Sequence, residues 1–199
     1  MYSLKKREDI KVSEHIKYFS ILLLISLFFP GCAQLSPEDK SDAKTKIDTM
    51  AKTTIDTLIE NSPEIFSSLE NAQGYAVVNW KVTKVPVVGA GGGDGVIVNK
   101  STGERKYIKV RRFDFGGGWG ARSFKNLVII HDEAIINKAM AGGSFKFEAG
   151  AEVAAGTAGV EGGSGDLNKG IESHMLLDGG GSATATVRFI YFTMDKDLN

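Results

Sequence analysis

Three features of this sequence contain residue types that could carry chemistry: a glycine-rich run, a histidine followed by two acids, and a single cysteine. The glycine-rich run, GAGGGDG at residues 89–95, invites comparison with nucleotide-binding loops, but Asp94 occupies the last glycine position of G-x-G-x-x-G. No Gly-Lys pair exists in the sequence for a phosphate-binding loop. We therefore predict that these glycines allow bulges, tight turns or close backbone packing in a curved sheet.

The histidine and the two acids, His131, Asp132 and Glu133, stand side by side in the sequence. Adjacent residues at a strand-to-helix junction do not converge on one metal ion as ligands spaced along one helix face do. We predict instead that Asp132 caps a short helix. The sequence has no G-x-S-x-G elbow, and the carboxylates of Glu148 and Glu152 are too ordinary to indicate acid–base chemistry. We expect no enzymatic activity, no metal site and no cofactor.

The cysteine, Cys32, follows a leader of the export type. Basic residues precede a run of twelve mostly apolar residues, 18–29, which is too short to span a bilayer and suits the hydrophobic region of a signal peptide. With Gly31 just before Cys32, the arrangement resembles a bacterial lipoprotein signal, in which the cysteine is lipidated and becomes the new N-terminus. We expect a signal peptide over 1–31 and a lipidated tether over 32–42. An uncleaved anchor and a plain secretory signal are the alternatives.

The overall charge is balanced, with 24 basic and 24 acidic residues, so no general attraction to nucleic acid follows. Glycine is enriched, at 24 of 199 residues, which favours a β-rich body because glycine is costly inside helices. The length beyond the tether suits one domain, which we place at 43–199.

Beyond the tether, the apolar residues recur with the spacing of one helical face. They are Ala43, Ile47, Met50, Ala51, Ile55, Leu58 and Ile59. The polar face of this predicted helix carries Lys44, Lys46 and Lys52. The apolar face either packs on the core of the domain or meets lipid beside the anchor.

A second helix is predicted to begin at Ser62-Pro63-Glu64, with Ser62 as its cap, and to end before Gly74. β-type periodicity follows from residue 75, and a short helix is expected at 132–140. After it we expect a strand over 144–156, a loop over 157–170, and two last strands around a turn at 178–181. These elements predict an α+β fold, with N-terminal amphipathic helices packed on a glycine-rich, mainly antiparallel sheet or barrel-like body and one short inserted helix.

The strand ERKYIKVRRFDF is the most basic part of the chain beyond the leader. Alternation places Arg105, Tyr107, Lys109 and Arg111 on one of its faces. This face is interpreted either as a solvated outer surface that discourages edge-to-edge association or as a surface that binds phosphate-bearing lipid headgroups.

Five segments taken in order resemble the SYLF domain family. They are ENAQGYAVV, GAGGGDGVIV, FGGGWGARSFKNLVII, HDEAIINKAM and FKFEAGAEVAAGTAG. The resemblance covers about 120 residues and points to the branch of bacterial lipoproteins. It implies an α+β domain that binds membrane lipid without catalysis, with an N-terminal amphipathic helix contributing to membrane contact.

Taken together, these features predict a membrane-anchored lipoprotein that binds phospholipid or anionic lipid headgroups. The lipid-binding candidates are Lys44, Lys46, Lys52, Arg105, Tyr107, Lys109 and Arg111. Because no aspartate follows Cys32, resemblance to lipoproteins implies the outer membrane, on its periplasmic side. The alternative is a structural or protein-interaction lipoprotein of the cell envelope, with an envelope protein as its partner. Nucleic acid is not an expected partner.

Overall fold

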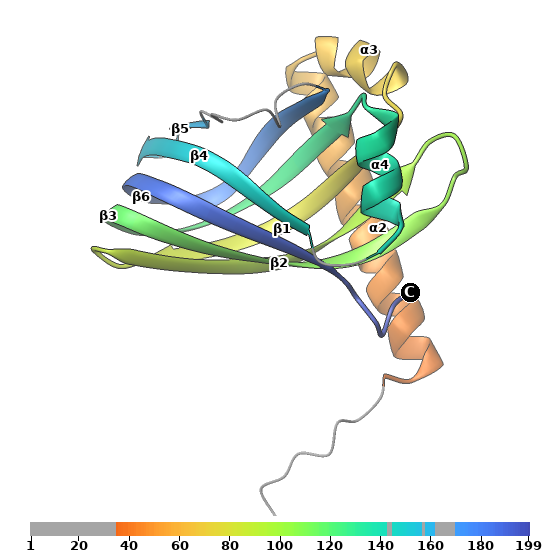
Figure 1. Cartoon of the computed structure of the whole chain (residues 1–199), viewed down its shortest axis with the longest axis horizontal. Helices are drawn as coiled ribbons and strands as arrows, with labels where there is room; N and C mark the ends of the chain where they lie inside the picture. Colours follow the sequence, from red (N-terminus) through yellow and green to blue (C-terminus); the bar gives the residue numbers. More distant parts are fainter. Residues whose placement is uncertain (1–34, 143–144, 157, 162–169) are drawn as a thin grey trace, which may run out of the picture. The chain divides into compact units, whose positions relative to one another are not determined.

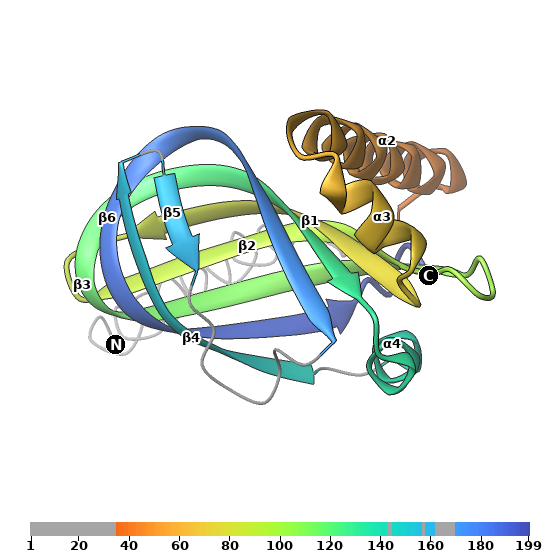
Figure 2. The same cartoon turned by 90° about the horizontal axis from the view of Figure 1, so that it is seen from above.

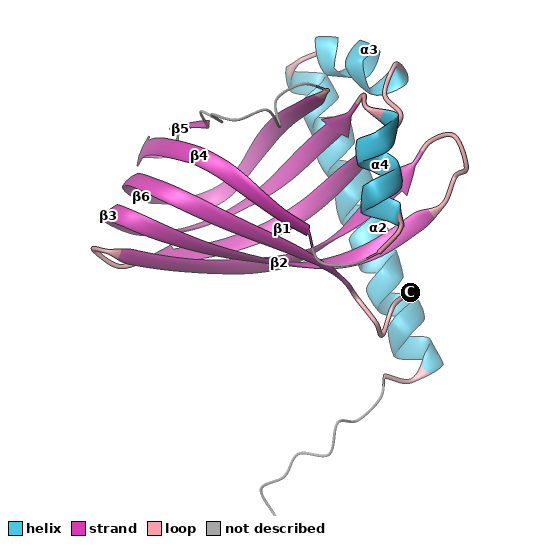
Figure 3. Cartoon of the chain, viewed as in Figure 1, coloured by secondary structure: helices cyan, strands magenta, loops and turns pink. Residues whose placement is uncertain are grey.

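The computed structural model describes residues 35–142, 145–156, 158–161 and 170–199; for residues 145–156, 158–161 and 180–188 it describes the backbone alone. The expected signal peptide and Cys32 lie outside the described residues. Residues Pro37–Asn199 form one compact unit. Within its described part, helices accompany a single curled antiparallel sheet, so the predicted α+β class with one short inserted helix is confirmed (Figure 3).

The N-terminal helix α2 (Pro37–Asn61) begins earlier than expected. Pro37 suits the first turn, where a missing N–H costs nothing, and the acidic Glu38 and Asp39 favour the positive end of the helix dipole. Residues 37–42, which we expected within the tether, are therefore helical. The apolar face of α2, including Ile47 and Leu58, packs into a core cluster with the sheet. This confirms packing on the domain's own core.

Two shorter helices end at defined positions. In α3 (Glu64–Glu70) the predicted Ser62 cap is wrong: the cap residue is Pro63, and no side chain accepts from the first turn. This helix is held at its other end, where Lys100 Nζ donates to the carbonyls of residues 69 and 70, each at 2.6 Å. In α4 (Glu133–Met140) the predicted cap is confirmed, because Asp132 Oδ1 accepts from the amides of residues 134 and 135 at 2.7 and 3.1 Å.

The sheet has the strand order β1-β2-β3-β6-β4-β5 across the described residues, and every pairing is antiparallel. The strands are β1 (Gly74–Lys84), β2 (Val88–Asn99), β3 (Arg105–Ile130), β4 (Phe145–Gly156), β5 (Ala158–Glu161) and β6 (Ile171–Met194). The first half of β3 pairs with β2 and its second half pairs with β1. The sheet therefore curls over into a half-barrel with a concave and a convex face (Figures 1 and 2).

The two longest strands differ from the sequence expectation. We predicted a strand over the segment ERKYIKVRRFDF, which ends at residue 115, and a turn over 178–181, but β3 continues to Ile130 and β6 continues through the expected turn. Gly116, Gly118 and Gly120 have φ values of 141°, 133° and 145°, which lets β3 bend while it stays paired with β6. The segment expected to be a loop contains β5; its residues 157 and 162–169 lie outside the described part.

Side chains from the two faces of the sheet form two separate cores. On the convex face, β1, β2 and β3 pack against α2 and α3, with Val77, Val96 and Leu127 fully buried. On the concave face, Trp80 and Phe124 stack with ring centroids 6.1 Å apart, and Ile136 of α4 joins the same cluster. Helix α4 therefore packs at one end of the concave face (Figure 2).

The glycines of β2 lie where this strand packs closely against β1. A Cβ on Gly95 would lie 2.3 Å from the carbonyl oxygen of Val77, and a Cβ on Gly91 would lie 2.7 Å from Cγ2 of Val82. Such separations are well inside van der Waals contact. Close backbone packing is thus the reason for this glycine run, as one of the sequence interpretations proposed.

Candidate functional site

The predicted basic face of β3 is divided by the helix that covers it. Arg105 donates to Asp48 of α2 at 2.8 Å, and the Tyr107 hydroxyl donates to the same carboxylate at 3.0 Å. Tyr107 is only 7% exposed, and Lys44 Nζ lies 5.4 Å from the centroid of its ring. Burial, together with the hydrogen bond and the negative charge of Asp48, raises the pKa of Tyr107. Arg105 and Tyr107 therefore hold α2 on the sheet.

The other helix candidates, Lys46 and Lys52, lie on the exposed side of α2. Lys52 forms an ion pair with Asp56, one helical turn later, at 2.5 Å. Because the apolar side of α2 packs against the sheet, the fully exposed residues of this helix are polar apart from Pro37. It does not have an exposed apolar face with which to enter a bilayer in this arrangement.

The far end of the basic face contains Lys109 and Arg111. Lys109 Nζ lies 3.1 Å from Asp195 and 3.9 Å from Asp197, so the C-terminal segment offsets its charge. Arg111 is exposed, and no carboxylate among the described residues pairs with it. Of the basic residues predicted on this face, Arg111 is the one with an accessible charge and no recorded counter-ion in the described part of the chain.

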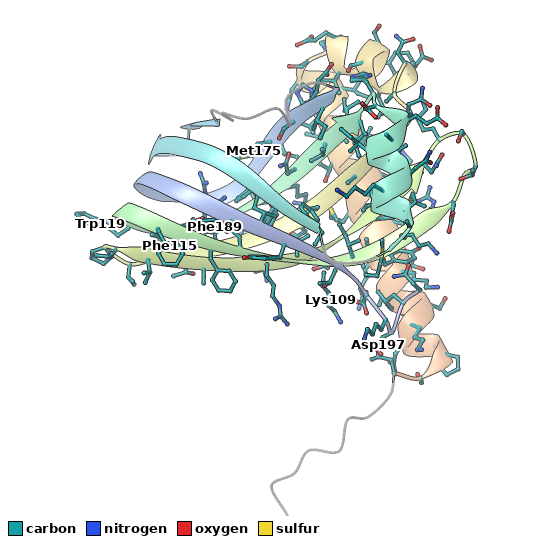
Figure 4. All side chains as sticks on the ribbon, viewed as in Figure 1. Lys109, Phe115, Trp119, Met175, Phe189 and Asp197 are labelled. Carbon is teal, nitrogen blue, oxygen red and sulfur yellow. The ribbon has the colours of Figure 1, made fainter. Side chains whose placement is uncertain are left out.

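Beyond Arg111 the same face of β3 becomes aromatic. The alternation that exposes Arg111 continues along the strand and exposes Phe113, Phe115 and Trp119, at 45%, 53% and 70% (Figure 4). Large side chains of this kind are normally buried. Sequence analysis missed them because it stopped the face at the last basic residue; extending the two-residue period through Phe115 would have found two of them.

Two other segments enlarge this exposed area. From β6, Phe189 lies edge-on to Phe115 with centroids 6.1 Å apart, and Tyr191 lies edge-on to Phe113 at 6.3 Å. The β1–β2 turn adds exposed valines, and its Val87 carbonyl accepts from the Gly116 amide at 3.0 Å. We call this surface the aromatic patch. It consists of Val85, Val87, Val88, Phe113, Phe115, Trp119, Phe189 and Tyr191.

The aromatic patch occupies the end of the sheet away from the helices. In Figure 3 the described helices gather around one end of the strands, while β2, β3 and β6 extend beyond them. The convex face is thus covered by α2 and α3 at one end and carries exposed aromatic residues at the other. Contiguous exposed apolar surface of this kind marks an interaction site.

A polar cluster outside the aromatic patch contains Ser68, His131 and Glu172, the residue types of a catalytic triad. Ser68 Oγ donates to Glu172 at 2.5 Å and lies 3.2 Å from His131 Nε2, and the same Nε2 lies 3.0 Å from Glu172. A catalytic triad uses opposite ring nitrogens of histidine for the nucleophile and for the orienting carboxylate. Here one nitrogen meets both groups, so the cluster does not have triad geometry. It connects α3, the β3–α4 junction and β6.

The same cluster predicts a pH dependence of stability. The hydrogen bond from Ser68, followed by contacts with His131 and His174, lowers the pKa of Glu172 below its ordinary value of 4.5. A carboxyl whose pKa is lower in the folded state than in the unfolded state stabilises the fold at any pH above its unfolded-state pKa. This stabilisation is lost as the pH falls through the pKa of the folded state. Glu172→Gln is expected to lower the free energy of unfolding by about 1 kcal/mol at pH 7, since the group is largely exposed.

Urea unfolding of the wild type and Glu172→Gln at several pH values tests this expectation. The difference in the free energy of unfolding between the two proteins should shrink as the pH falls below about 4, where the carboxyl of the folded protein becomes protonated. Glu104→Gln, a change in an exposed carboxylate paired with Lys106 at 2.9 Å, is a control from another part of the surface. A difference that stays the same at every pH would contradict the assigned cause.

Within the described residues, no group of three or more His, Cys, Asp or Glu side chains is placed to hold a metal ion. None of the described helices combines the length and the apolar character needed to cross a membrane.

Comparison with known proteins gives one distant similarity. No family model matches the chain. The chain is similar to Beta cell expansion factor A of Aeromonas veronii, with 28% identity over 169 residues, which is 82% of this chain and 62% of that protein. The chain thus spans less than two thirds of this relative, whose name specifies neither a ligand nor a reaction.

Proposed function

We propose that this chain is a non-catalytic, membrane-anchored lipoprotein that binds phospholipid or anionic lipid headgroups through a SYLF-like domain. The observation that carries the proposal is the aromatic patch with the exposed Arg111 at its border. In the register of the sheet Arg111 lies opposite Tyr191, and Phe113 lies opposite Phe189, so the cation and the aromatic residues are neighbours.

This combination suits the boundary of a bilayer. Aromatic side chains are enriched at membrane interfaces, and an exposed arginine can contact lipid phosphates. A basic residue near an anionic surface contributes on the order of 1 kcal/mol, and removing apolar side chains from water contributes about 25 cal/mol per Å². The proposal therefore moves membrane contact from the predicted α2 lysines and Arg105 to the opposite end of the same sheet face.

The anchor belongs to the same proposal. Lipidation of Cys32 would tether the domain to a membrane, for which the periplasmic side of the outer membrane is the proposed location. A tethered domain meets lipid at high effective concentration, so a weak intrinsic affinity of the aromatic patch is sufficient. The SYLF likeness remains a proposal that rests on the five sequence segments and agrees in fold class with the α+β architecture.

Vesicle flotation of residues 33–199, which lack the anchor, tests the proposal. The vesicles contain phosphatidylethanolamine and phosphatidylglycerol in a 3:1 ratio. The double change Phe115→Ser and Trp119→Ser is expected to weaken partitioning into vesicles at least about tenfold, because the variant lacks two exposed aromatic rings that the wild type transfers from water to the membrane. Arg111→Gln is expected to weaken it by about fivefold at low salt and to reduce its salt dependence.

Phe66→Ser provides the matched control, since Phe66 of α3 is 52% exposed, like Phe115, but lies outside the aromatic patch. This variant should partition as the wild type does. If the wild type fails to bind vesicles of this composition and also vesicles of pure phosphatidylglycerol, intrinsic lipid recognition is excluded. A stoichiometric protein crosslink through the patch would then favour the interaction lipoprotein.

A further inference from the structure

Charged side chains lie buried on the concave face of the sheet, at the end away from α4. Four of them are at most 7% exposed: Lys84, Arg112, Asp114 and Arg122. Lys84 and Asp114 both lie opposite Gly89 in the strand register, and Arg122 lies opposite Val82. These pairings bring the four side chains to neighbouring positions on β1 and on both halves of β3. The four side chains lie on the concave face, beyond the apolar core of that face.

Both oxygens of the carboxylate in this group accept hydrogen bonds from Arg112. Asp114 Oδ1 accepts from Arg112 Nε at 2.7 Å, and Oδ2 accepts from Nη2 at 2.8 Å. The Arg122 guanidinium lies 5.0 Å from the centroid of the Phe124 ring. The guanidinium of Arg112 and the carboxylate of Asp114 thus form a buried ion pair.

Lys84 is the member of the group that lacks a partner. Its side-chain nitrogen is buried and makes no hydrogen bond to any group that the structure describes, and the residue is only 4% exposed. A Cβ on Gly89 would lie 3.3 Å from Lys84 Cβ and 3.2 Å from Asp114 Cβ, so the two side chains leave the backbone on either side of Gly89. The ammonium of Lys84 nevertheless makes no hydrogen bond to the carboxylate of Asp114. A lysine ammonium offers three donors and no acceptor.

A buried ammonium without an acceptor is strongly unfavourable, because it has lost its hydration without compensation. The component that would complete the group is therefore an acceptor that carries negative charge. We propose that Lys84 binds an oxyanion, specifically a phosphate group, at this end of the concave face. Lysine is a compact point charge that suits phosphate.

The position of Lys84 relates this site to the exposed surface. Lys84 is the last residue of β1, and the turn that follows it carries Val85 and Val87 of the aromatic patch. A phosphate at Lys84 would lie near the same turn but on the opposite face of the sheet from the patch, either as a free ion or as part of a lipid headgroup. The site is a separate proposal from membrane contact, since free phosphate can occupy it without a bilayer.

Calorimetric titration of the full chain in a neutral detergent tests the site with two probes, inorganic phosphate and dihexanoyl phosphatidic acid. Saturable binding of the wild type at 1:1 is expected, and Lys84→Met should weaken it at least tenfold. Lys81→Met is the matched control, because Lys81 lies on the same strand but is exposed on its other side, and this variant should bind as the wild type does.

Binding of both probes would mean that the phosphate group alone is recognised, and binding of phosphatidic acid alone would assign the site to a lipid headgroup. No saturable binding of either probe to the wild type overturns the proposal, whatever the variants do. Equal binding by the wild type and Lys84→Met overturns it as well. If Lys84→Met does not fold, Lys84→Arg, which keeps the charge, and Lys84→Gln provide the comparison. Retention of binding only in the arginine variant is expected, and equal binding by both overturns the site.

Thermal unfolding without ligand provides a second readout. Lys84→Met should unfold at the same temperature as the wild type or higher, because the variant no longer buries an ammonium that lacks an acceptor. Added phosphate should raise the unfolding temperature of the wild type and leave that of the variant unchanged. A purely structural lysine would show the opposite order, with the variant unfolding earlier and phosphate affecting both proteins equally.

Discussion

Gly93→Ala is expected to destabilise the domain by about 3 kcal/mol or more, at the upper end of the range for overpacking a filled interior. A Cβ at this position would lie 1.7 Å from the carbonyl oxygen of Asn79 and 2.9 Å from its carbonyl carbon. Both atoms belong to the backbone of β1, which pairs with β2 along its whole length. They cannot rotate away as a side chain could, so the two strands must separate. Urea unfolding followed by circular dichroism measures the loss.

Gly117→Ala is the matched control for this prediction. Gly117 lies at the bend of β3, its φ is not positive, and a Cβ there would meet nothing within 4 Å. Its replacement should change the free energy of unfolding by no more than about 0.5 kcal/mol. If both substitutions lowered the free energy of unfolding by the same amount, close packing of β2 against β1 would not be the reason for the glycines of β2.

Asp114→Ala is expected to lower the free energy of unfolding by about 3–5 kcal/mol, the range for removing one partner of a buried ion pair. The side chains of Asp114 and Arg112 are 1% and 3% exposed, and two hydrogen bonds join them. Removing the carboxylate leaves the guanidinium buried without this counter-ion. The free energy of unfolding in urea at pH 7 measures the effect.

Two comparisons distinguish a broken ion pair from a lost packing contact. The double change Arg112→Met and Asp114→Leu removes both charges and should recover most of the stability, because apolar replacements of buried pairs are often neutral or stabilising. Asp56→Ala breaks the exposed pair with Lys52 and should cost less than about 1 kcal/mol. A double variant as unstable as Asp114→Ala would show that shape, and not charge, governs this position.

Local features of the chain were predictable to the extent that they depend on nearby residues. The face of α2 that contains Ile47 and Leu58 follows from helical spacing, and the Asp132 cap follows from one side chain and the two amides that it reaches. The exception was Ser62, where Pro63 takes the cap position and no side-chain bond forms.

The continuity of the long strands was not predictable in this way. Glycines at 116–120 and 179–181 indicate a break when each segment is considered alone. They become bends because β3 and β6 pair across these positions, and the hydrogen bonds of the pair hold both strands extended. Pairing partners so far apart in sequence are not visible in the local pattern.

For the candidate site, the sequence by itself determined the alternation along β3 that puts Arg105, Lys109 and Arg111 on one face, since this depends only on the two-residue period of a strand. Tertiary structure decided which of these side chains is accessible. Arg105 meets Asp48, 57 residues earlier in the chain, and Lys109 meets the C-terminal Asp195, while Arg111 remains exposed beside the aromatic residues of β6. A charge is available for recognition only where folding brings no opposite charge to it, and this depends on contacts that the local sequence does not contain.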